Sequence, residues 1–301
     1  FLFNRRKDKI NRYTQEHPLI PSNDIHTLFA DSKSRLWIGT DNGVVWFDLE
    51  NRTFHPFSDI VAPETFANNR VYAMDEGRGG TMWFATRNGL HAYNGASLKS
   101  YYSRQYDTTS LTSNFVYDVM VDSKGSVWAA TNKGLNHYLG ENQGFRRFQR
   151  ESLTCSNCLV SNETLCLHED HQGNIWIGTV GGLNKYDPDS GVMTTYTEQD
   201  GLPNNLIYAI QEDRSGNLWI SSNKGLTKMD VVTGRMINYG IHDGLQDYEF
   251  NHLAACQADD GEMFFGGISG LNAFYPDSIQ QSNYVPNIEI TSAEVIKKKK
   301  K

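Results

Sequence analysis

The chain has 301 residues, and its 39% hydrophobic residues, 12% aromatic residues and 26 glycines are typical of an all-β protein with tight turns. The net charge of −7 includes the run Lys297–Lys301, so the rest of the chain is more acidic still, which disfavours nucleic acid as a partner. No window is apolar over the roughly 18 residues that a membrane helix needs, so we expect attachment to a membrane only through a helix outside this sequence.

The predicted elements repeat with a period of about 45 residues. Asp31–Val44 reads Asp-x-x-x-x-Leu-Trp-Ile-Gly-Thr-x-x-Gly-Val, and similar segments recur along the chain with an aromatic residue in the Trp position. These aromatic residues are Trp37, Trp83, Trp128, Trp176, Trp219 and Phe264. Each copy reads as four short strands joined by Gly or Asp-Gly turns. Because such meanders bury their faces only by stacking around an axis, the repeat predicts a β-propeller with four-stranded antiparallel blades.

The residues shared by the copies have structural roles in this fold. We expect each Trp ring to wedge between neighbouring blades. Small residues that follow the Trp, such as Gly39 and Gly178, allow backbones to approach closely. The glycine that opens each third strand, such as Gly43, is placed where a hairpin turn needs a positive φ.

The two ends of the repeat array predict how the ring closes. Phe3–Tyr13 aligns without gaps to Phe47–Phe57, the third and fourth strands of a copy, whereas the sixth copy has no fourth strand after Tyr275. Ile10–Thr14 is therefore a candidate for the outer strand of the last blade. Six copies and a half leave two closures open, a seven-bladed parent and a six-bladed ring of this segment. We assign residues 1–278 to the propeller, 279–296 to a linker and the first strand of a following domain, and 297–301 to an artificial poly-Lys tail.

The residues that vary between copies indicate a ligand site on one face of the ring. The loop into the first strand and the loop between the second and third strands open on the same face, and loops on such rigid scaffolds commonly carry binding residues. The positions thirteen before and four after the Trp change from copy to copy. The candidate ligand-binding residues at these positions are Asp24, Asp41, Arg70, Arg87, Phe115, Asn132, Glu163, Asn223 and Asn251. Arg70 and Arg87 belong to one blade and either clamp a carboxylate or sugar acid or pair with nearby acids at the rim.

Two further sets of equivalent positions carry the same residue type in several copies. An Asn precedes the variable position in five copies, as in Asn114, and is predicted to form a turn by bonding its own backbone. Tyr72, Tyr117 and Tyr208, eleven before the Trp, either stack on sugar rings or pack between inner strands.

The four cysteines are predicted to have structural roles. Cys155 and Cys158 lie in the longest linker between copies and would form a small-loop disulfide in an oxidising compartment, since a metal site would need a second such pair. Cys166 and Cys256 lie in first strands and are predicted to be buried thiols.

The pattern Glu-Asp-x-x-Gly-Asn-Leu-Trp-Ile at Glu212–Ile220, followed by Gly225-Leu226 and preceded by the linker Asp200–Asn205, resembles the two-component-regulator propeller repeats. These repeats form the extracytoplasmic sensor region of hybrid histidine kinases and related bacterial regulators. The resemblance covers residues 1–278, although the second copy has Gly77 in place of the acidic turn residue. It implies a periplasmic sensor for a small-molecule or oligosaccharide ligand, a β-sandwich after Pro286, and a homodimer formed through the parent receptor. It implies no catalysis and no cofactor.

Two other functions remain open at this point. Propellers also serve as protein-interaction scaffolds. A bacterial lyase that inactivates streptogramin antibiotics shares this fold, and such a metal-dependent site would need a general base and a metal ligand near the funnel. His26, His252 and Glu163 lie at that face, but no spacing such as His-x-x-Glu supports a metal site, so we expect neither a metal nor an enzyme.

Overall fold

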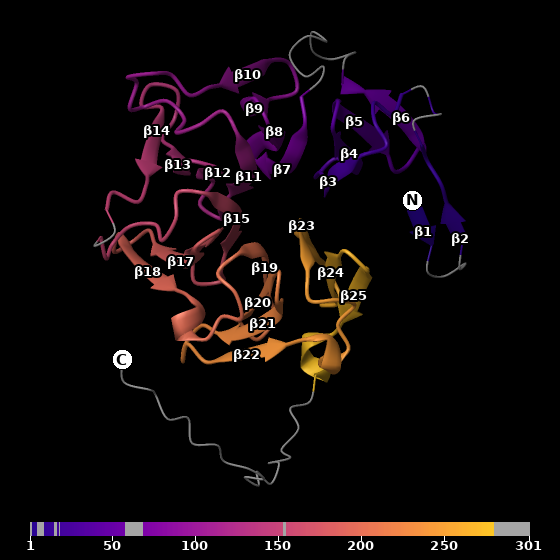
Figure 1. The fold of residues 1–301 in the computed structure, drawn as a ribbon. Coiled ribbons are helices and arrows are strands. Elements are labelled where there is room, and N and C mark those ends of the chain that lie inside the picture. Colours follow the sequence, from indigo (N-terminus) through magenta and orange to yellow (C-terminus); the bar gives the residue numbers. More distant parts are fainter. Residues whose placement is uncertain are drawn as a thin grey trace, which may run out of the picture.

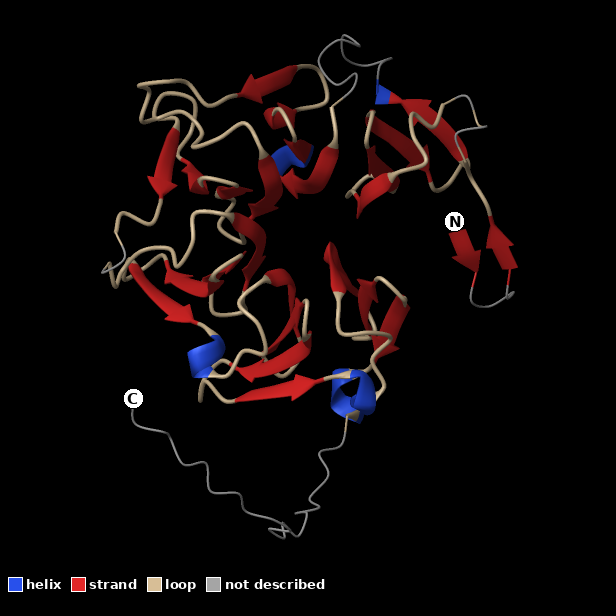
Figure 2. Ribbon diagram, viewed as in Figure 1, coloured by secondary structure: helices blue, strands red, loops and turns tan. Residues whose placement is uncertain are grey.

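The computed structural model describes residues 2–4, 9–14, 17, 19–57, 69–152 and 155–279. These residues form antiparallel sheets that follow one another around a common centre (Figure 1). Strands and loops make up almost all of the fold (Figure 2). Single-turn 3₁₀ helices span Arg78–Gly80, Glu198–Asp200, Ile241–Asp243 and Pro276–Ser278. The predicted all-β propeller is confirmed.

Each blade is a meander in which strands pair in chain order. The first blade consists of β3 (Ile25–Ala30), β4 (Arg35–Thr40), β5 (Gly43–Asp48) and β6 (Thr53–Pro56), and the second of β7 (Val71–Gly77), β8 (Thr81–Thr86), β9 (Gly89–Tyr93) and β10 (Leu98–Tyr101). The third consists of β11 (Val116–Val121), β12 (Val127–Thr131), β13 (Gly134–Tyr138) and β14 (Phe145–Phe148), and the fourth of β15 (Thr164–Glu169), β16 (Ile175–Thr179), β17 (Gly182–Asp187) and β18 (Val192–Tyr196). The fifth consists of β19 (Ile207–Glu212), β20 (Asn217–Ser222), β21 (Gly225–Asp230) and β22 (Met236–Tyr239). The sixth has three strands in the described chain, β23 (Phe250–Gln257), β24 (Met263–Gly267) and β25 (Gly270–Phe274).

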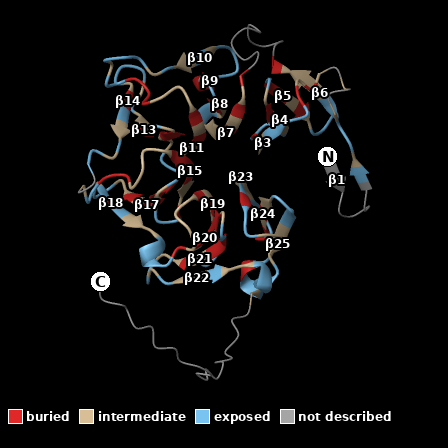
Figure 3. Cartoon of the chain, in the orientation of Figure 1, coloured by how far each residue is buried: buried red, intermediate tan, exposed pale blue. Residues whose placement is uncertain are grey.

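The hydrophobic core lies between blades rather than within one sheet. Trp37 is fully buried, and its ring lies 5.6 Å from that of Phe84 in the next blade. Trp219 is likewise fully buried and lies 4.9 Å from Phe274 of the sixth blade. Figure 3 shows buried residues along the strands and exposed ones mainly in the loops and outer strands. The predicted role of the repeated Trp as a wedge between blades is therefore confirmed. Burial of each indole stabilises the propeller by roughly 2–3 kcal/mol.

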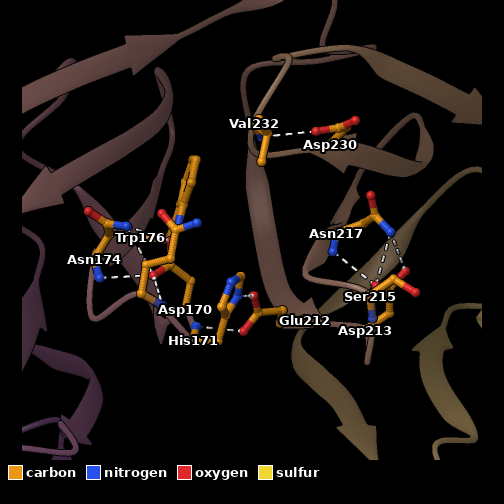
Figure 4. Close-up of polar contacts among 11 residues, drawn as sticks. Asp170, His171, Asn174, Trp176, Glu212, Asp213, Ser215, Asn217, Asp230 and Val232 are labelled. Carbon is orange, nitrogen blue, oxygen red and sulfur yellow. Dashed lines mark hydrogen bonds and ion pairs between the residues drawn. The ribbon is translucent and has the colours of Figure 1, made fainter.

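Four aspartates hold the indole N–H groups of these buried rings. In the fourth blade, Trp176 Nε1 donates to Asp170 Oδ2 at 2.8 Å, and Asn174 donates to the same carboxylate (Figure 4). The other pairs are Asp31 with Trp37, Asp122 with Trp128 and Asp213 with Trp219. The sixth copy lacks both partners, because Phe264 stands in the Trp position and Ala258 in the Asp position. The acidic turn residue is thus an anchor for the indole, a role that its position in the repeat did not reveal.

Carboxylates also join neighbouring blades at these turns. Ser32 of the first blade donates its backbone N–H and its hydroxyl to Glu76 of the second, both at 2.7 Å. Ser123 binds Glu169 in the same way. At the next junction, His171 uses its backbone N–H and Nδ1 to bind Glu212 (Figure 4).

The N-terminal half repeat does not complete the last blade. β1 (Leu2–Asn4) pairs with β2 (Lys9–Asn11), with Phe3 opposite Ile10, as a separate two-stranded sheet. The prediction that Ile10–Thr14 forms the outer strand of the sixth blade is therefore wrong. A hairpin closed by a short loop forms at a lower entropy cost than a pairing between distant chain segments. The described residues form six blades, as the six copies of the repeat predict.

The predictions for residues 280–296 and 297–301 lie outside the described residues.

The cysteine predictions have mixed outcomes. Cys155 and Cys158 form a disulfide, and Cys166 is a buried thiol, as expected. Cys256 is exposed, so its predicted burial is wrong. It lies on the face of the sixth blade that no further blade covers among the described residues.

Candidate functional site

The inner strands of the first five blades each contain a β-bulge near their start. In β7, the register shifts between Val71 and Ala73, which leaves Tyr72 without a paired residue on β8. The same shift occurs at the equivalent positions of β3, β11, β15 and β19. A bulge interrupts the alternation of side chains and re-aims the extra residue. The residues at the bulges are His26, Tyr72, Tyr117, Leu165 and Tyr208.

Several of these side chains meet around the centre of the ring and form an aromatic belt. We define the belt as His26, Tyr72, Phe115, Tyr117 and His252. Ring centroids lie 5.9 Å apart for His26 and Tyr72, 5.9 Å for Tyr72 and Tyr117, and 5.6 Å for Tyr117 and His252. Phe115 lies 4.9 Å from Tyr117 and 5.4 Å from Tyr72. Packing between inner strands, one of the two interpretations of this column, is therefore confirmed for Tyr72 and Tyr117.

Two hydrogen bonds fix the side of the belt that faces the fourth blade. Tyr117 donates its hydroxyl to Glu163 Oε1 at 3.1 Å. Burial and the charge of Glu163 raise the pKa of Tyr117 to about 12, so the hydroxyl keeps its proton. His252 Nε2 lies 2.8 Å from the carbonyl oxygen of Leu165, and burial lowers the pKa of this imidazole. His252 is therefore a neutral donor near pH 7.

A charged cluster lies at the other end of the belt. Asp41 Oδ1 is 2.5 Å from His26 Nε2 and 2.5 Å from Arg70 Nε, and Arg70 Nη2 donates to Asp41 Oδ2 at 3.1 Å. The hydrogen bond from His26, together with Arg70, holds the pKa of Asp41 below its usual value, although burial opposes this effect. The Arg70 guanidinium also lies 5.8 Å from the Tyr72 ring. The cluster thus spans the junction between the first and second blades.

The Arg70–Arg87 clamp for a ligand stays a prediction, but the structure shows what each arginine does without one. Arg70 is held by Asp41 of the neighbouring blade, whereas Arg87 is exposed. The alternative interpretation, pairing with a nearby acid, is correct for Arg70. The sequence alignment placed both arginines in one blade but contained no signal for the contact across the junction.

The two variable columns do share one face. The backbone N–H of Asp41 donates to Asp24 O at 3.1 Å, and that of Arg87 donates to Arg70 O at 3.0 Å. Asn132 N donates to Phe115 O, and Val180 N donates to Glu163 O. The side chains of Asp24 and Asn251 are exposed and contribute no contact to the belt within the described residues.

Two of the candidate amides have a buried oxygen that is not hydrogen bonded. Asn132 Oδ1 and Asn223 Oδ1 are buried and find no partner among the described residues. Buried polar atoms are nearly always hydrogen bonded in native proteins, so these two oxygens have unused capacity to accept a donor.

The constant Asn column has a different role from the predicted one. Asn114 Oδ1 accepts the backbone N–H of Ser103 at 2.6 Å, and Asn205 Oδ1 accepts that of Glu198 at 2.9 Å. Asn162 binds Arg150 N in the same way. These residues tie the preceding linker to the first strand instead of bonding their own backbone, a long-range contact that no local turn pattern predicts.

The chemistry available at this face is recognition by stacking and hydrogen bonding. The described part of the chain contains no group of three or more His, Cys, Asp or Glu side chains that could hold a metal ion. Its helical elements include none with the length and apolar character that crossing a membrane requires.

Comparison with known proteins identifies the repeats. The family described as two component regulator propeller matches residues 19–42, 110–133, 158–181 and 201–224. Four segments of the chain therefore match two-component-regulator propeller repeats, and the resemblance seen in the sequence is confirmed.

Among solved structures, the chain is similar to the extracellular domain of a hybrid two-component system from B. thetaiotaomicron. The two are 25% identical with a TM-score of 0.74, over 85% of this chain and 34% of that one. The chain thus spans about a third of the length of this relative. No curated protein matches the sequence.

Two lyases share the fold alone. A streptogramin B lyase is 12% identical with a TM-score of 0.67, over 90% of this chain and 84% of the lyase. Virginiamycin B lyase from Staphylococcus aureus is 13% identical with a TM-score of 0.63, over 83% of this chain and 79% of the lyase.

Proposed function

We propose that the chain is the extracytoplasmic, ligand-sensing propeller of a two-component receptor of the hybrid histidine kinase type. It binds a carbohydrate or another nutrient-derived small molecule in the periplasm and does not convert it. The parent receptor acts as a homodimer and passes the signal through a membrane helix outside this chain. The observation that carries the proposal is the aromatic belt flanked by Asp41 and Arg70 at one end and Glu163 at the other.

The belt and its flanking groups suit a sugar ring. The apolar C–H face of a sugar stacks on aromatic rings such as Phe115. Its hydroxyls donate to carboxylates such as those of Asp41 and Glu163. Binding sites of this kind combine an apolar lining with a few fixed polar groups. The likeness to the extracellular domain of a hybrid two-component system supports a sensor with this location.

A lyase is the second candidate function. It is favoured by the short contact between His26 and Asp41, which would orient an imidazole as a general base, together with the fold shared with streptogramin lyases.

Calorimetric titration with a panel of neutral and acidic oligosaccharides tests the proposal. We expect selective binding of at least one compound, with the compound recovered unchanged and its affinity insensitive to EDTA. Phe115→Ala and Arg70→Ala should each weaken binding at least about tenfold, because they remove a stacking face and a charge-assisted donor. Tyr106→Ala is the matched control, since Tyr106 is 94% exposed in an outer linker.

Three results would contradict the proposal. Conversion of a bound compound that stops on addition of EDTA would establish a lyase. Binding that is unaffected by both site variants would move the site away from the belt. Absence of binding to every member of the panel would reject a carbohydrate ligand.

A further inference from the structure

The second blade keeps the repeated Trp but lacks the carboxylate that holds the indole in other blades. Trp83 is 6% exposed, and Gly77 stands six residues before it. In four other blades this position is an aspartate that accepts the indole N–H, as Asp170 does for Trp176 (Figure 4). The sixth copy has Phe264, which has no N–H to satisfy. Among the six described blades, only the second therefore combines a buried indole with the loss of its acceptor.

Two hydrogen-bond donors have no side-chain acceptor at this place. Within the described chain, Trp83 Nε1 donates no hydrogen bond. The second donor is a backbone N–H. In the fourth blade, Asn174 N donates to Asp170 Oδ1 at 2.9 Å while the indole binds the other oxygen, and the equivalent backbone donors in three other blades are Arg35, Ser126 and Asn217. Thr81 holds this position in the second blade, and its N–H donates to no side chain among the described residues. Buried donors are nearly always hydrogen bonded, so the indole in particular favours an acceptor from outside the chain.

A cavity of about 330 Å³ lies beside these donors. Gly77 and the turn Arg78–Gly80 line it, together with Ser32 of the first blade and Ser123 of the third. Trp83 Nε1 faces Gly77, because a Cβ on that glycine would lie 3.2 Å from this nitrogen. The backbone of Gly77 is extended, with φ −86° and ψ 175°, so its conformation does not require glycine. The cavity is within the size range of small-molecule sites.

Charged groups of both signs border this cavity. Glu76 and Asp122 line it, but their oxygens already accept hydrogen bonds from other groups of the fold. Arg78 also lines it, and Lys33 Nζ would lie 3.6 Å from a Cβ on Gly80. The two cations offset the two carboxylates. The unused indole and backbone donors then favour an anion, since N–H groups that converge at a turn form anion sites.

We propose that this cavity, which we call the turn pocket, binds the carboxylate of a small organic acid. One carboxylate oxygen accepts the indole N–H of Trp83 and the other accepts the backbone N–H of Thr81, as the two oxygens of the repeat aspartate do in four other blades. Charge-assisted hydrogen bonds of this kind are stronger than those to a neutral acceptor such as water. The turn pocket is distinct from the aromatic belt, because Tyr72 lies near the start of β7 and Gly77 at its end, about 17 Å apart along the strand.

Titration with sodium acetate, followed by nuclear magnetic resonance, tests the turn pocket. Each tryptophan gives its own indole N–H signal, and a Trp83→Phe variant identifies the signal of Trp83. At constant pH and ionic strength, acetate should shift this signal downfield and saturate it at roughly 1–10 mM, a range within reach of so small a ligand. The Trp128 signal is the internal control, since Asp122 already holds that N–H at 2.9 Å. Acetamide, a neutral molecule of the same shape, should bind at least about tenfold more weakly.

A variant that supplies the carboxylate from the chain itself locates the site. Gly77→Asp restores the residue found in four other blades and should move the Trp83 signal downfield in the absence of acetate, because the extended backbone accepts the side chain. Acetate should then cause no further shift. Ala96→Asp is the matched control, since it adds the same charge in an exposed loop between β9 and β10 of the same blade. It should leave the response to acetate unchanged.

Three results would overturn the proposal. A Trp83 signal that acetate leaves in place, or that acetamide shifts at the same concentration, would show that these donors do not select an anion. This result needs no variant, so it decides the question even if Gly77→Asp does not fold. A full response of folded Gly77→Asp to acetate would place the anion elsewhere. Binding of a blocked aspartate peptide at least about tenfold tighter than acetate would assign the turn pocket to an acidic side chain of a partner protein instead of a free acid.

Discussion

Two buried aspartates in this propeller have opposite electrostatic environments. Burial alone would raise the pKa of Asp170, but hydrogen bonds from Trp176, Asn174 and backbone N–H groups outweigh it and hold the pKa below 3.8. Asp118 accepts only the backbone N–H groups of Leu167 and Val119, both at 2.8 Å. Burial dominates there and raises its pKa to about 8. The number and kind of donors therefore decide which of these carboxyls is charged at neutral pH.

Asp118 should make stability depend on pH. Because its folded-state pKa lies above the ordinary value of 3.8, the neutral carboxyl stabilises the fold below pH 4, and this stabilisation is lost as the pH rises toward 8. We expect Asp118→Asn, which cannot ionise, to gain at least about 1 kcal/mol relative to the natural protein between pH 5 and pH 8.5. Urea unfolding of both proteins across this range is the measurement. Parallel profiles for the two proteins would show that Asp118 does not hold a proton in the folded state.

In the first and fourth blades, the first and second strands approach closely where a glycine on the second strand lies opposite a larger residue on the first. Gly39 lies opposite Thr27 and Gly178 opposite Cys166, whereas in the second blade Ala85 lies opposite Ala73. A Cβ on Gly178 would meet Cys166 Sγ and Ile207 of the next blade at less than van der Waals distance. The larger residue on one strand is thus matched by glycine on the other.

This pairing predicts that a second substitution restores the stability lost by the first. Gly178→Ala should destabilise the protein by about 1–3 kcal/mol, because the new methyl group overpacks the junction. Adding Cys166→Ala reproduces the Ala–Ala pair of the second blade and should recover at least half of the loss. Thermal and urea unfolding of the two variants and of Cys166→Ala alone complete the cycle. Equal destabilisation by Gly178→Ala with and without Cys166→Ala would refute the compensation.

The strands themselves could be predicted from sequence more completely than the contacts between their side chains. Alternation, Gly turns and the repeated Trp define four strands per copy, and the columns around the Trp correctly place Asp24 with Asp41 on one face. The bulges that re-aim His26, Tyr72 and Tyr117 depend on pairing register, which the residues at those positions do not specify. The contact between Arg70 and Asp41 depends on how neighbouring blades meet, so a single copy of the repeat contains no signal for it.

At the scale of the molecule, the repeat correctly predicted a propeller. The predicted pairing of the N-terminal segment Ile10–Thr14 with the sixth blade was wrong. Each interior blade contacts its neighbours through the same two faces. The residue pattern of one copy of the repeat therefore predicts the packing of all interior blades. The ends have no such template, because their pairing is decided by loop entropy and by which faces find a partner. The exposed Cys256, predicted to be buried, is a direct consequence of this difference between interior and terminal blades.

The terminal blades should therefore open more easily than the interior ones. The first and sixth blades are each covered on one face only within the described chain, as the exposure of Leu28 and Leu271 shows, whereas the third and fourth blades are covered on both. Local opening free energy falls where fewer apolar contacts must be broken. Hydrogen exchange followed by mass spectrometry should show amides of β4, β5 and β24 exchanging at least about tenfold faster than those of β12, β13 and β16. The central strands of adjacent blades provide the internal control, since their backbone pairing is the same and only the covering of their faces differs. Uniform exchange across all six blades would mean that the ring opens as one cooperative unit and that the uncovered faces do not weaken its ends.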